Sequence, residues 1–165
     1  MSRTNYEHAA DPPESGPGLL TGDCIRVALF SADQSLTESL QSAISPGDRF
    51  LLETTGIDRR GMSTWLLRHP MDLAIVDLEP PINDSLSAMS LIANLRPNVQ
   101  VMALMSRHSL DAATVAVQAG AQSCLLKETS GAHDVIAALS GLMIGTSTIS
   151  PRIARVLINR LRQLH

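Results

Sequence analysis

The sequence predicts an α/β domain built on a doubly wound, five-stranded parallel sheet. Five short apolar runs alternate along the chain with five segments of helical periodicity, as expected of strand–helix units. The central run, residues 73–76, lies between Pro70 and Pro80 and contains no polar side chain, which is typical of a strand buried on both faces. Right-handed crossovers between successive strands then make the sheet parallel.

The composition narrows the class of protein. The chain has 165 residues, enough for one domain with a core and tails, and 44% of them are hydrophobic against 18% charged. Aromatic residues make up only 2%, so we expect an aliphatic, Met-rich core and no stacking platform for single-stranded nucleic acid. The net charge of −3 argues against a basic footprint over the whole surface.

The sequence also indicates a cytoplasmic location. No apolar run approaches the length of a membrane span, and the first residues lack the charged-then-apolar pattern of a signal peptide. Cys24 and Cys124 fall at or in expected strands, without CxxC or His-rich spacing. We therefore expect two reduced, packed thiols in a cytoplasmic protein.

Turn and capping residues divide the chain into its elements. A capping box at 35–38 predicts the start of the first helix, Ser109 that of the fourth, and Thr129 or Ser130 that of the fifth. The first helix ends at 45–47, the fourth at Gly120 and the fifth near Gly145, and the second and third are expected at 58–69 and 84–95. The expected strands are 25–30, 49–54, 73–77, 99–105 and 123–126.

Helical spacing selects the residues that face the core from each helix. They are Leu36, Leu40, Ala43 and Ile44; Met62, Trp65 and Leu66; Leu86, Met89 and Ile92 or Ala93; the small residues Ala112, Ala113, Ala116 and Val117; and Val135, Ile136, Leu139 and Leu142. We therefore expect a disordered tail at 1–22, rich in Pro, Gly, Ser and acids, one domain at 23–145 and a C-terminal segment at 146–165.

A further helix is expected after Ser150, the N-cap, and Pro151, the first helical residue. Four arginines and no acid lie in this segment, whereas the rest of the chain holds nine basic against 16 acidic residues. We favour a terminal helix that packs on the domain with solvated arginines, or one that pairs with a copy of itself, over nucleic-acid binding. Its apolar stripe consists of Ile153, Val156, Leu157, Leu161 and Leu164.

The carboxyl ends of strands one, three, four and five should meet at one crevice of such a sheet. A carboxylate there can attack a phosphoryl group to form an acyl phosphate, a lysine can hold the phosphate, and a divalent cation would neutralise the developing charge. A simpler alternative is that Asp77 only caps its loop. The residues expected at the crevice are Ser31, Ala32, Asp33, Asp77, Met105, Ser106 and Lys127.

Three stretches resemble the receiver domain of two-component response regulators. They are residues 27–34 (VALFSADQ), residues 72–84 (DLAIVDLEPPIND), and Ala119-Gly120-Ala121 with Leu125-Leu126-Lys127-Glu128. The last of these, with Ser150-Pro151-Arg152-Ile153-Ala154 after it, resembles the NarL/FixJ-like subgroup, whose output domain is a helix-turn-helix. The resemblance extends over residues 25–142.

The resemblance implies a flavodoxin-like sheet order of 2-1-3-4-5, phosphorylation of Asp77, phosphate contacts by Lys127 and Ser106, and a requirement for Mg²⁺. A histidine kinase or a small acyl phosphate would supply the phosphoryl group, and two copies of the chain would pair. DNA would be bound only through a helix-turn-helix that this sequence does not contain. Both a stand-alone receiver and a fragment of a longer transcription regulator fit this pattern.

The sequence departs from the family at the acidic pocket. The family has two acidic residues directly after the first strand, and this chain has Ser31 and Ala32 at those positions. Asp33 comes one place too late to face the crevice. Met105 replaces the hydroxyl residue that drives the switch, and Cys124 replaces the aromatic residue that rotates.

Few Mg²⁺ ligands remain in such a pocket. Asp77, a backbone carbonyl such as that of Glu79, and a poorly placed Asp33 would hold the ion weakly. We therefore expect slow or absent phosphoryl transfer to Asp77, and a resting ion pair between Lys127 and Asp77.

The favoured hypothesis is an atypical, non-enzymatic receiver that takes part in transcription regulation through protein contacts. The first alternative is a conventional receiver in which Asp33 swings in to bind the metal. An aspartyl-phosphate phosphohydrolase with Glu79 as its acid/base is a minor alternative. A nucleotide-binding flavodoxin-like protein ranks lower, because no Gly-rich loop follows the first strand.

Overall fold

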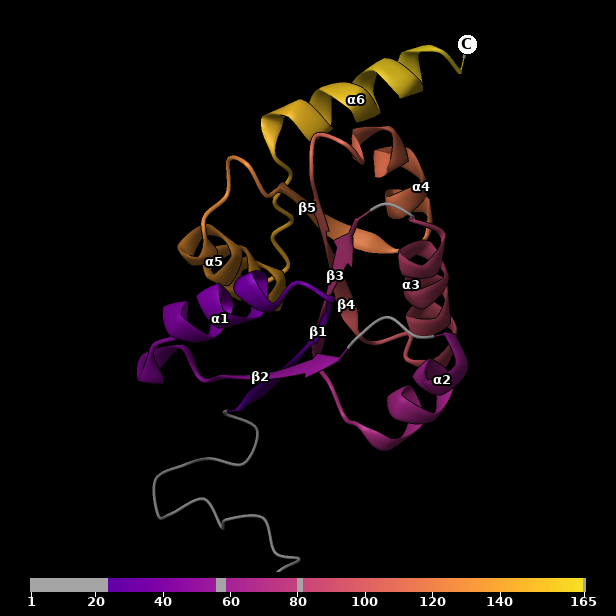
Figure 1. Cartoon of the computed structure of the whole chain (residues 1–165). Coiled ribbons are helices and arrows are strands. Elements are labelled where there is room, and N and C mark those ends of the chain that lie inside the picture. The colour runs from indigo at the N-terminus through magenta and orange to yellow at the C-terminus, as the bar shows by residue number, and fades with distance from the viewer. Residues whose placement is uncertain (1–23, 56–58, 80–81, 165) are drawn as a thin grey trace, which may run out of the picture.

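The computed structural model describes residues 24–55, 59–79 and 82–164, and the tail expected at 1–22 lies outside them. Five parallel strands form one sheet in the order β2-β1-β3-β4-β5 (Figure 1). This order confirms the predicted fold class. The strands are β1 (Ile25–Phe30), β2 (Phe50–Thr55), β3 (Leu73–Leu78), β4 (Gln100–Met105) and β5 (Ala121–Leu126).

Helices cover both faces of the sheet. Figure 1 shows α1 and α5 on one face, α2, α3 and α4 on the other, and α6 beside α4 near the β5 edge. The helices are α1 (Gln34–Ala43), α2 (Arg59–Arg68), α3 (Asn83–Leu95), α4 (Ala113–Gln118), α5 (Ala132–Met143) and α6 (Pro151–Arg162), with 3₁₀ turns at Pro46–Asp48 and Leu110–Ala112. Among the described residues, no helix has the length and apolar character needed to cross a membrane.

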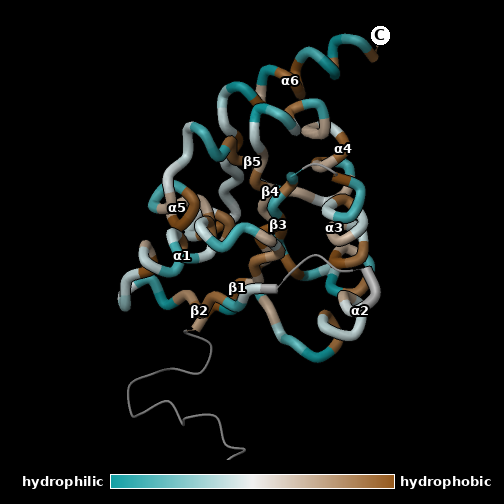
Figure 2. Tube along the Cα trace, viewed as in Figure 1, coloured by the Kyte–Doolittle hydropathy of each residue, from teal (hydrophilic) through white to brown (hydrophobic). Residues whose placement is uncertain are grey.

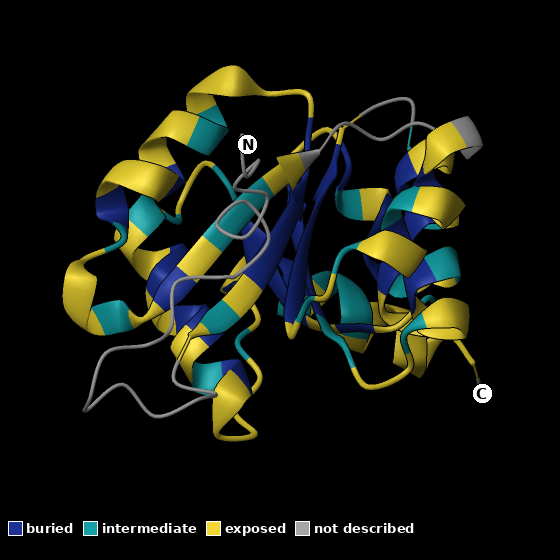
Figure 3. Ribbon diagram, turned by 90° about the horizontal axis from the view of Figure 1, so that it is seen from below, coloured by how far each residue is buried: buried dark blue, intermediate teal, exposed yellow. Residues whose placement is uncertain are grey.

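Alternate strand residues supply two core clusters, one under each helical layer. In β1, Val27 and Leu29 pack with α1 and α5, whereas Ala28 and Phe30 pack with α2 and α3. All six residues of β3 are buried, which confirms the central strand, and Figure 3 shows the inner strands in dark blue while the edge strand β2 is more exposed. Figure 2 shows hydrophobic segments, in brown, in the strands and in the helices on both sides of the sheet.

The segment between α5 and α6 covers the outer edge of β5. The amide of Cys124 donates to the carbonyl of Thr148 at 2.9 Å, and the amide of Ser150 donates to the carbonyl of Cys124 at 3.0 Å. Ser150 is the N-cap of α6 and Pro151 its first residue, as predicted, but the Ser150 hydroxyl accepts a hydrogen bond from the Leu126 amide at 2.8 Å and makes no side-chain capping bond to the helix. These bonds carry the chain to α6, whose Ile153 is fully buried in the same cluster as strand residues. The expected division at residue 145 stays a prediction.

Two expected helix caps are wrong, and the third, Ser109, precedes the 3₁₀ turn that leads into α4 without a side-chain capping bond. Asp33, and not Ser35, caps α1, because its side chain accepts a hydrogen bond from the Leu36 amide at 3.2 Å. Gly131 precedes α5, and its amide donates to Asp134 at 2.9 Å, a place we gave to Thr129 or Ser130. Ser109 lies in a buried turn, where its hydroxyl bonds the backbone of Ser106.

One of the two thiols also differs from expectation. Cys124 is buried in β5, as predicted, but Cys24 is exposed just before β1. Neither forms a disulfide. The prediction for Cys24 was wrong because the residue precedes the first strand residue and so lies outside the sheet's core.

Candidate functional site

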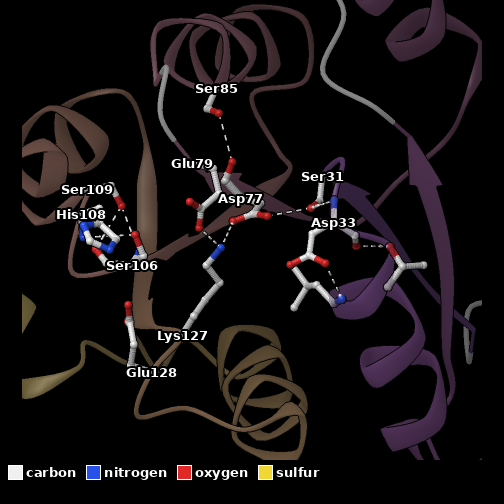
Figure 4. A network of polar contacts seen from close by, with 12 residues as sticks. Ser31, Asp33, Asp77, Glu79, Ser85, Ser106, His108, Ser109, Lys127 and Glu128 are labelled. Atoms are coloured by element: carbon white, nitrogen blue, oxygen red, sulfur yellow. Dashed lines mark hydrogen bonds and ion pairs between the residues drawn. The ribbon is translucent and has the colours of Figure 1, made fainter.

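Asp77 lies at the carboxyl end of β3 with both oxygens of its carboxylate engaged. The side chain is 3% exposed. Oδ1 accepts a hydrogen bond from Lys127 Nζ at 2.7 Å, and Oδ2 accepts one from the Ser31 hydroxyl at 2.7 Å (Figure 4). The parallel register of β1, β3, β4 and β5 places these residues at one edge of the sheet. The predicted convergence of Ser31, Asp77 and Lys127, and the predicted ion pair, are present.

Lys127 holds two carboxylates together. Its ammonium contacts Asp77 and also forms an ion pair with Glu79, which sits two residues further along the chain (Figure 4). Burial alone would lower the pKa of Lys127, but hydrogen bonds to Asp77 and Glu79 and the charges of both outweigh it. The pKa of Lys127 therefore lies above its ordinary value, and the ammonium stays charged.

Backbone hydrogen bonds fix the three strand ends that meet here. The Ser85 hydroxyl, buried in the first turn of α3, donates to the Asp77 carbonyl at 3.0 Å. The Lys127 amide donates to the Met105 carbonyl at 2.7 Å, and the Asp33 amide donates to the Ser31 hydroxyl at 3.0 Å. The Ser31 hydroxyl thus receives one hydrogen bond and gives one, which sets its direction toward Asp77.

The two other pocket residues expected after β1 do not reach Asp77 through polar contacts. Ala32 has no polar side-chain atom. The Asp33 side chain is exposed and caps α1, so its carboxylate serves the Leu36 amide. The cap holds because an N-terminal helix turn offers unpaired amides that a carboxylate satisfies well.

The two expected switch positions, Met105 and Cys124, are buried in the core. Met105 is fully buried at the end of β4, opposite Leu126. The Ser106 hydroxyl accepts a hydrogen bond from the His108 amide at 3.2 Å, and no hydrogen bond among the described residues joins it to Asp77 or Lys127. Burial raises the pKa of the Cys124 thiol to about 11.

The donor set does not suit the Mg²⁺ that the resemblance implies. Hard cations are held by several oxygen ligands, usually including more than one carboxylate. Asp77 is bonded to Ser31 and Lys127, Glu79 is bonded to the same ammonium, and Asp33 is used by α1. Among the described residues, no cluster of three or more His, Cys, Asp or Glu side chains is suited to a metal ion. The positive charge beside Asp77 is supplied by Lys127.

One contributor to the site, Ser85, was missed in the sequence, and the role of Glu79 differs from the one expected. Ser85 holds the Asp77 backbone, and its signal was a hydroxyl at helical spacing with the buried Ala88, Met89 and Ile92. Glu79 was expected to offer its carbonyl to a metal ion or, in the minor alternative, to act as an acid/base, but its side chain pairs with Lys127. No signal in the sequence indicates that pairing, since it depends on the path of the chain after β3.

Comparison by sequence finds one distant relative. No protein-family model matches the chain. The chain is similar to the protein-glutamate methylesterase/protein-glutamine glutaminase 1 of Rhodospirillum rubrum, with 26% identity over 111 residues. That match covers 66% of this chain but only 28% of the methylesterase, so the chain spans well under half of that relative.

Comparison by structure identifies the fold. A LuxR-family two-component response regulator from Aurantimonas sp. SI85-9A1 superposes with a TM-score of 0.70 and 18% identity, covering 84% of this chain and 99% of that one. The isolated REC domain of RcsB from Salmonella enterica serovar Typhimurium, in its apo form, gives 0.67 and 14%, covering 81% and 98%. The chain therefore has the fold of response regulator receiver domains. Its solved neighbours include a receiver of the LuxR family and that of RcsB.

Proposed function

We propose that this chain is an atypical receiver module that signals through protein contacts and accepts a phosphoryl group at Asp77 slowly or not at all. The observation that carries the proposal is that Lys127 and Ser31 occupy both oxygens of the Asp77 carboxylate. A carboxylate that attacks phosphorus needs a free oxygen and a cation to screen its charge from the phosphate. Here the screening cation is a lysine already bound to two acids.

The proposal has a wider part that rests on the fold. It describes a module of transcription regulation, without enzymatic activity of its own, in the cytoplasm. Its partners would be a histidine kinase and a second copy of the chain, with DNA bound only through a separate output domain. The support for this part is analogy of fold, since the chain superposes on receiver domains of response regulators.

The test is phosphorylation by acetyl phosphate with Mg²⁺, read by intact-protein mass spectrometry. We expect little or no gain of one phosphoryl mass in the unchanged chain. The double change Ser31→Asp with Ala32→Asp should raise the phosphorylated fraction, because it returns two carboxylates to the end of β1. Adding Asp77→Ala to that variant should remove the gain.

The variant Asp33→Ala distinguishes the atypical receiver from the conventional receiver, in which Asp33 would bind the metal ion. If the unchanged chain gains a full phosphoryl mass, and Asp33→Ala abolishes that gain, then Asp33 does reach the metal and the protein is a conventional receiver. If Asp33→Ala lowers only thermal stability, by about 1 kcal/mol for a lost helix cap, its role is that seen in the structure. Circular dichroism and the mass measurement give the two readouts on the same samples.

A further inference from the structure

The helix α6 carries an apolar flank whose C-terminal part is exposed among the described residues. Ala154, Leu157, Ile158 and Leu161 follow the i, i+3, i+4, i+7 spacing of one helix side, and we call them the α6 flank. Ala154 and Leu157 are half-buried, whereas Ile158 is 49% and Leu161 62% exposed. Ile153 is fully buried and Leu157 packs against the same core cluster, so the flank adjoins the packed face at Leu157 and leaves it at Ile158 and Leu161.

The C-terminal half of α6 stands apart from α4. A cavity of about 590 Å³ separates the two helices, lined on the α6 side by Val156, Asn159, Arg160, Gln163 and Leu164. Ile158 and Leu161 are exposed and are not among the residues that line this cavity. The helix is therefore anchored near its N-terminal end by Ile153, whereas Ile158 and Leu161 further along it are exposed.

Unpaired arginines border the flank. Arg155 and Arg162 lie three residues before and four residues after Ile158, which places both along its outer edge. Both are exposed, and neither forms an ion pair with a described residue. No acidic residue occurs in α6, so the helix offers positive charge only.

We propose that the α6 flank docks an acidic amphipathic helix of a partner protein. The spacing matches the ridge that one helix presents to another, and the two arginines on its outer edge are complementary to carboxylates along one side of the partner's apolar stripe. A second copy of α6 fits poorly, because face-to-face pairing would bring arginines together without one carboxylate to compensate. A lipid surface fits poorly as well, since the flank has no Trp, Tyr or Phe anchor.

The test uses a fluorescein-labelled synthetic helix of about 20 residues, long enough to be helical when bound. It carries Leu at i, i+3, i+4 and i+7 and Glu at the flanking positions; a control peptide has Lys in place of Glu. Anisotropy titration against the full chain should show saturable binding of the Glu peptide that weakens as salt is raised, and little binding of the Lys peptide. Because Asp77 takes no part, the result is independent of the function proposed above.

Variants with matched controls locate the binding. Leu161→Ser and Arg155→Glu should each raise the dissociation constant at least about tenfold, whereas Arg155→Lys should retain binding. The controls are Leu67→Ser and Arg68→Glu on α2, because Leu67 is 66% exposed and Arg68 is exposed, so the same changes occur on another helix. All four altered residues are exposed, and circular dichroism should show unchanged folding.

Three results would overturn the proposal. One is equal binding of the Glu and Lys peptides, and another is binding that Leu161→Ser leaves unchanged. The third is capture of the flank by a different occupant. This would be seen as a dimer in sedimentation that Leu161→Ser dissociates, or as binding to phosphatidylserine vesicles that exceeds binding to the Glu peptide.

Discussion

At the scale of residues, one buried acid, Asp77, connects the ends of three strands through hydrogen bonds to Ser31 and Lys127, and we call these three residues the clasp. Asp77 on β3 is bonded to Ser31 after β1 and to Lys127 after β5. A buried ion pair contributes little net free energy by itself, but removing one partner leaves a charge that is neither solvated nor paired. The clasp is therefore more sensitive to the loss of Lys127 than to the loss of the exposed Glu79.

Replacing Lys127 tests this sensitivity. Lys127→Met should lower the free energy of unfolding by about 2 kcal/mol or more, because Asp77 would stay buried without its cation. Glu79→Gln serves as the control and should cost less than about 1 kcal/mol, since Glu79 is 45% exposed. Urea denaturation of both variants gives the comparison. Equal losses would mean that Asp77 gains nothing from its lysine.

At the scale of elements, one face of α6 packs against the domain and another face is exposed. Ile153 is fully buried, whereas Ile158 on the same helix is half exposed. Ile153→Ala should lower the free energy of unfolding by about 2–4 kcal/mol through lost burial and the cavity left behind. Ile158→Ala makes the same chemical change on the free side and should cost less than about 1 kcal/mol. Similar values from chemical denaturation would contradict the division.

The elements were largely predictable from sequence, and their exact ends were not. The expected strand at 25–30 matches β1, because an apolar run with a polar turn after it leaves one interpretation. The caps failed because several Ser, Thr and Asp residues stand near each helix start, and tertiary contacts select among them. Ser109 illustrates this, since its hydroxyl is taken by Ser106.

The sequence could predict those features of the site that depend only on the order of the strands in the sheet. Parallel strands in the order 2-1-3-4-5 bring Ser31, Asp77 and Lys127 to one edge, whatever their distance in the sequence. The hydrogen bond from Ser31 and the ion pair to Glu79 depend on side-chain orientations in the loops after the strands. Such orientations follow from packing around each loop and leave no periodic pattern in the sequence.

At the scale of the whole molecule, stability should fall at alkaline pH. The native pKa of Cys124 is raised from 9.0 to about 11, and that of Lys127 is raised above 10.5. Above pH 9 the unfolded state loses protons that the native state keeps, so the free energy of unfolding decreases as pH rises. Between pH 9 and pH 11 we expect Cys124 to account for a loss of about 2 kcal/mol.

Matched cysteine variants check this pH dependence. Denaturation of Cys124→Ala at several pH values should show a flatter decline than that of the unchanged chain. Cys24→Ala should leave the decline as it is, because Cys24 is exposed in the native state. Thiol labelling of the native protein near pH 8 should modify Cys24 and spare Cys124, and complete labelling of both without denaturant would contradict the burial on which the prediction depends.

The covering of β5 by residues 148–150 limits how copies of this sheet can join. An exposed strand edge is a template on which further strands can add, and repeated addition produces filaments. Here one end of the sheet is closed by the chain itself, while no described residue pairs with the outer edge of β2. If two copies paired through their β2 edges, only the β5 edges would remain, and residues 148–150 cover these. Strand addition would then stop at a dimer and would not produce a filament.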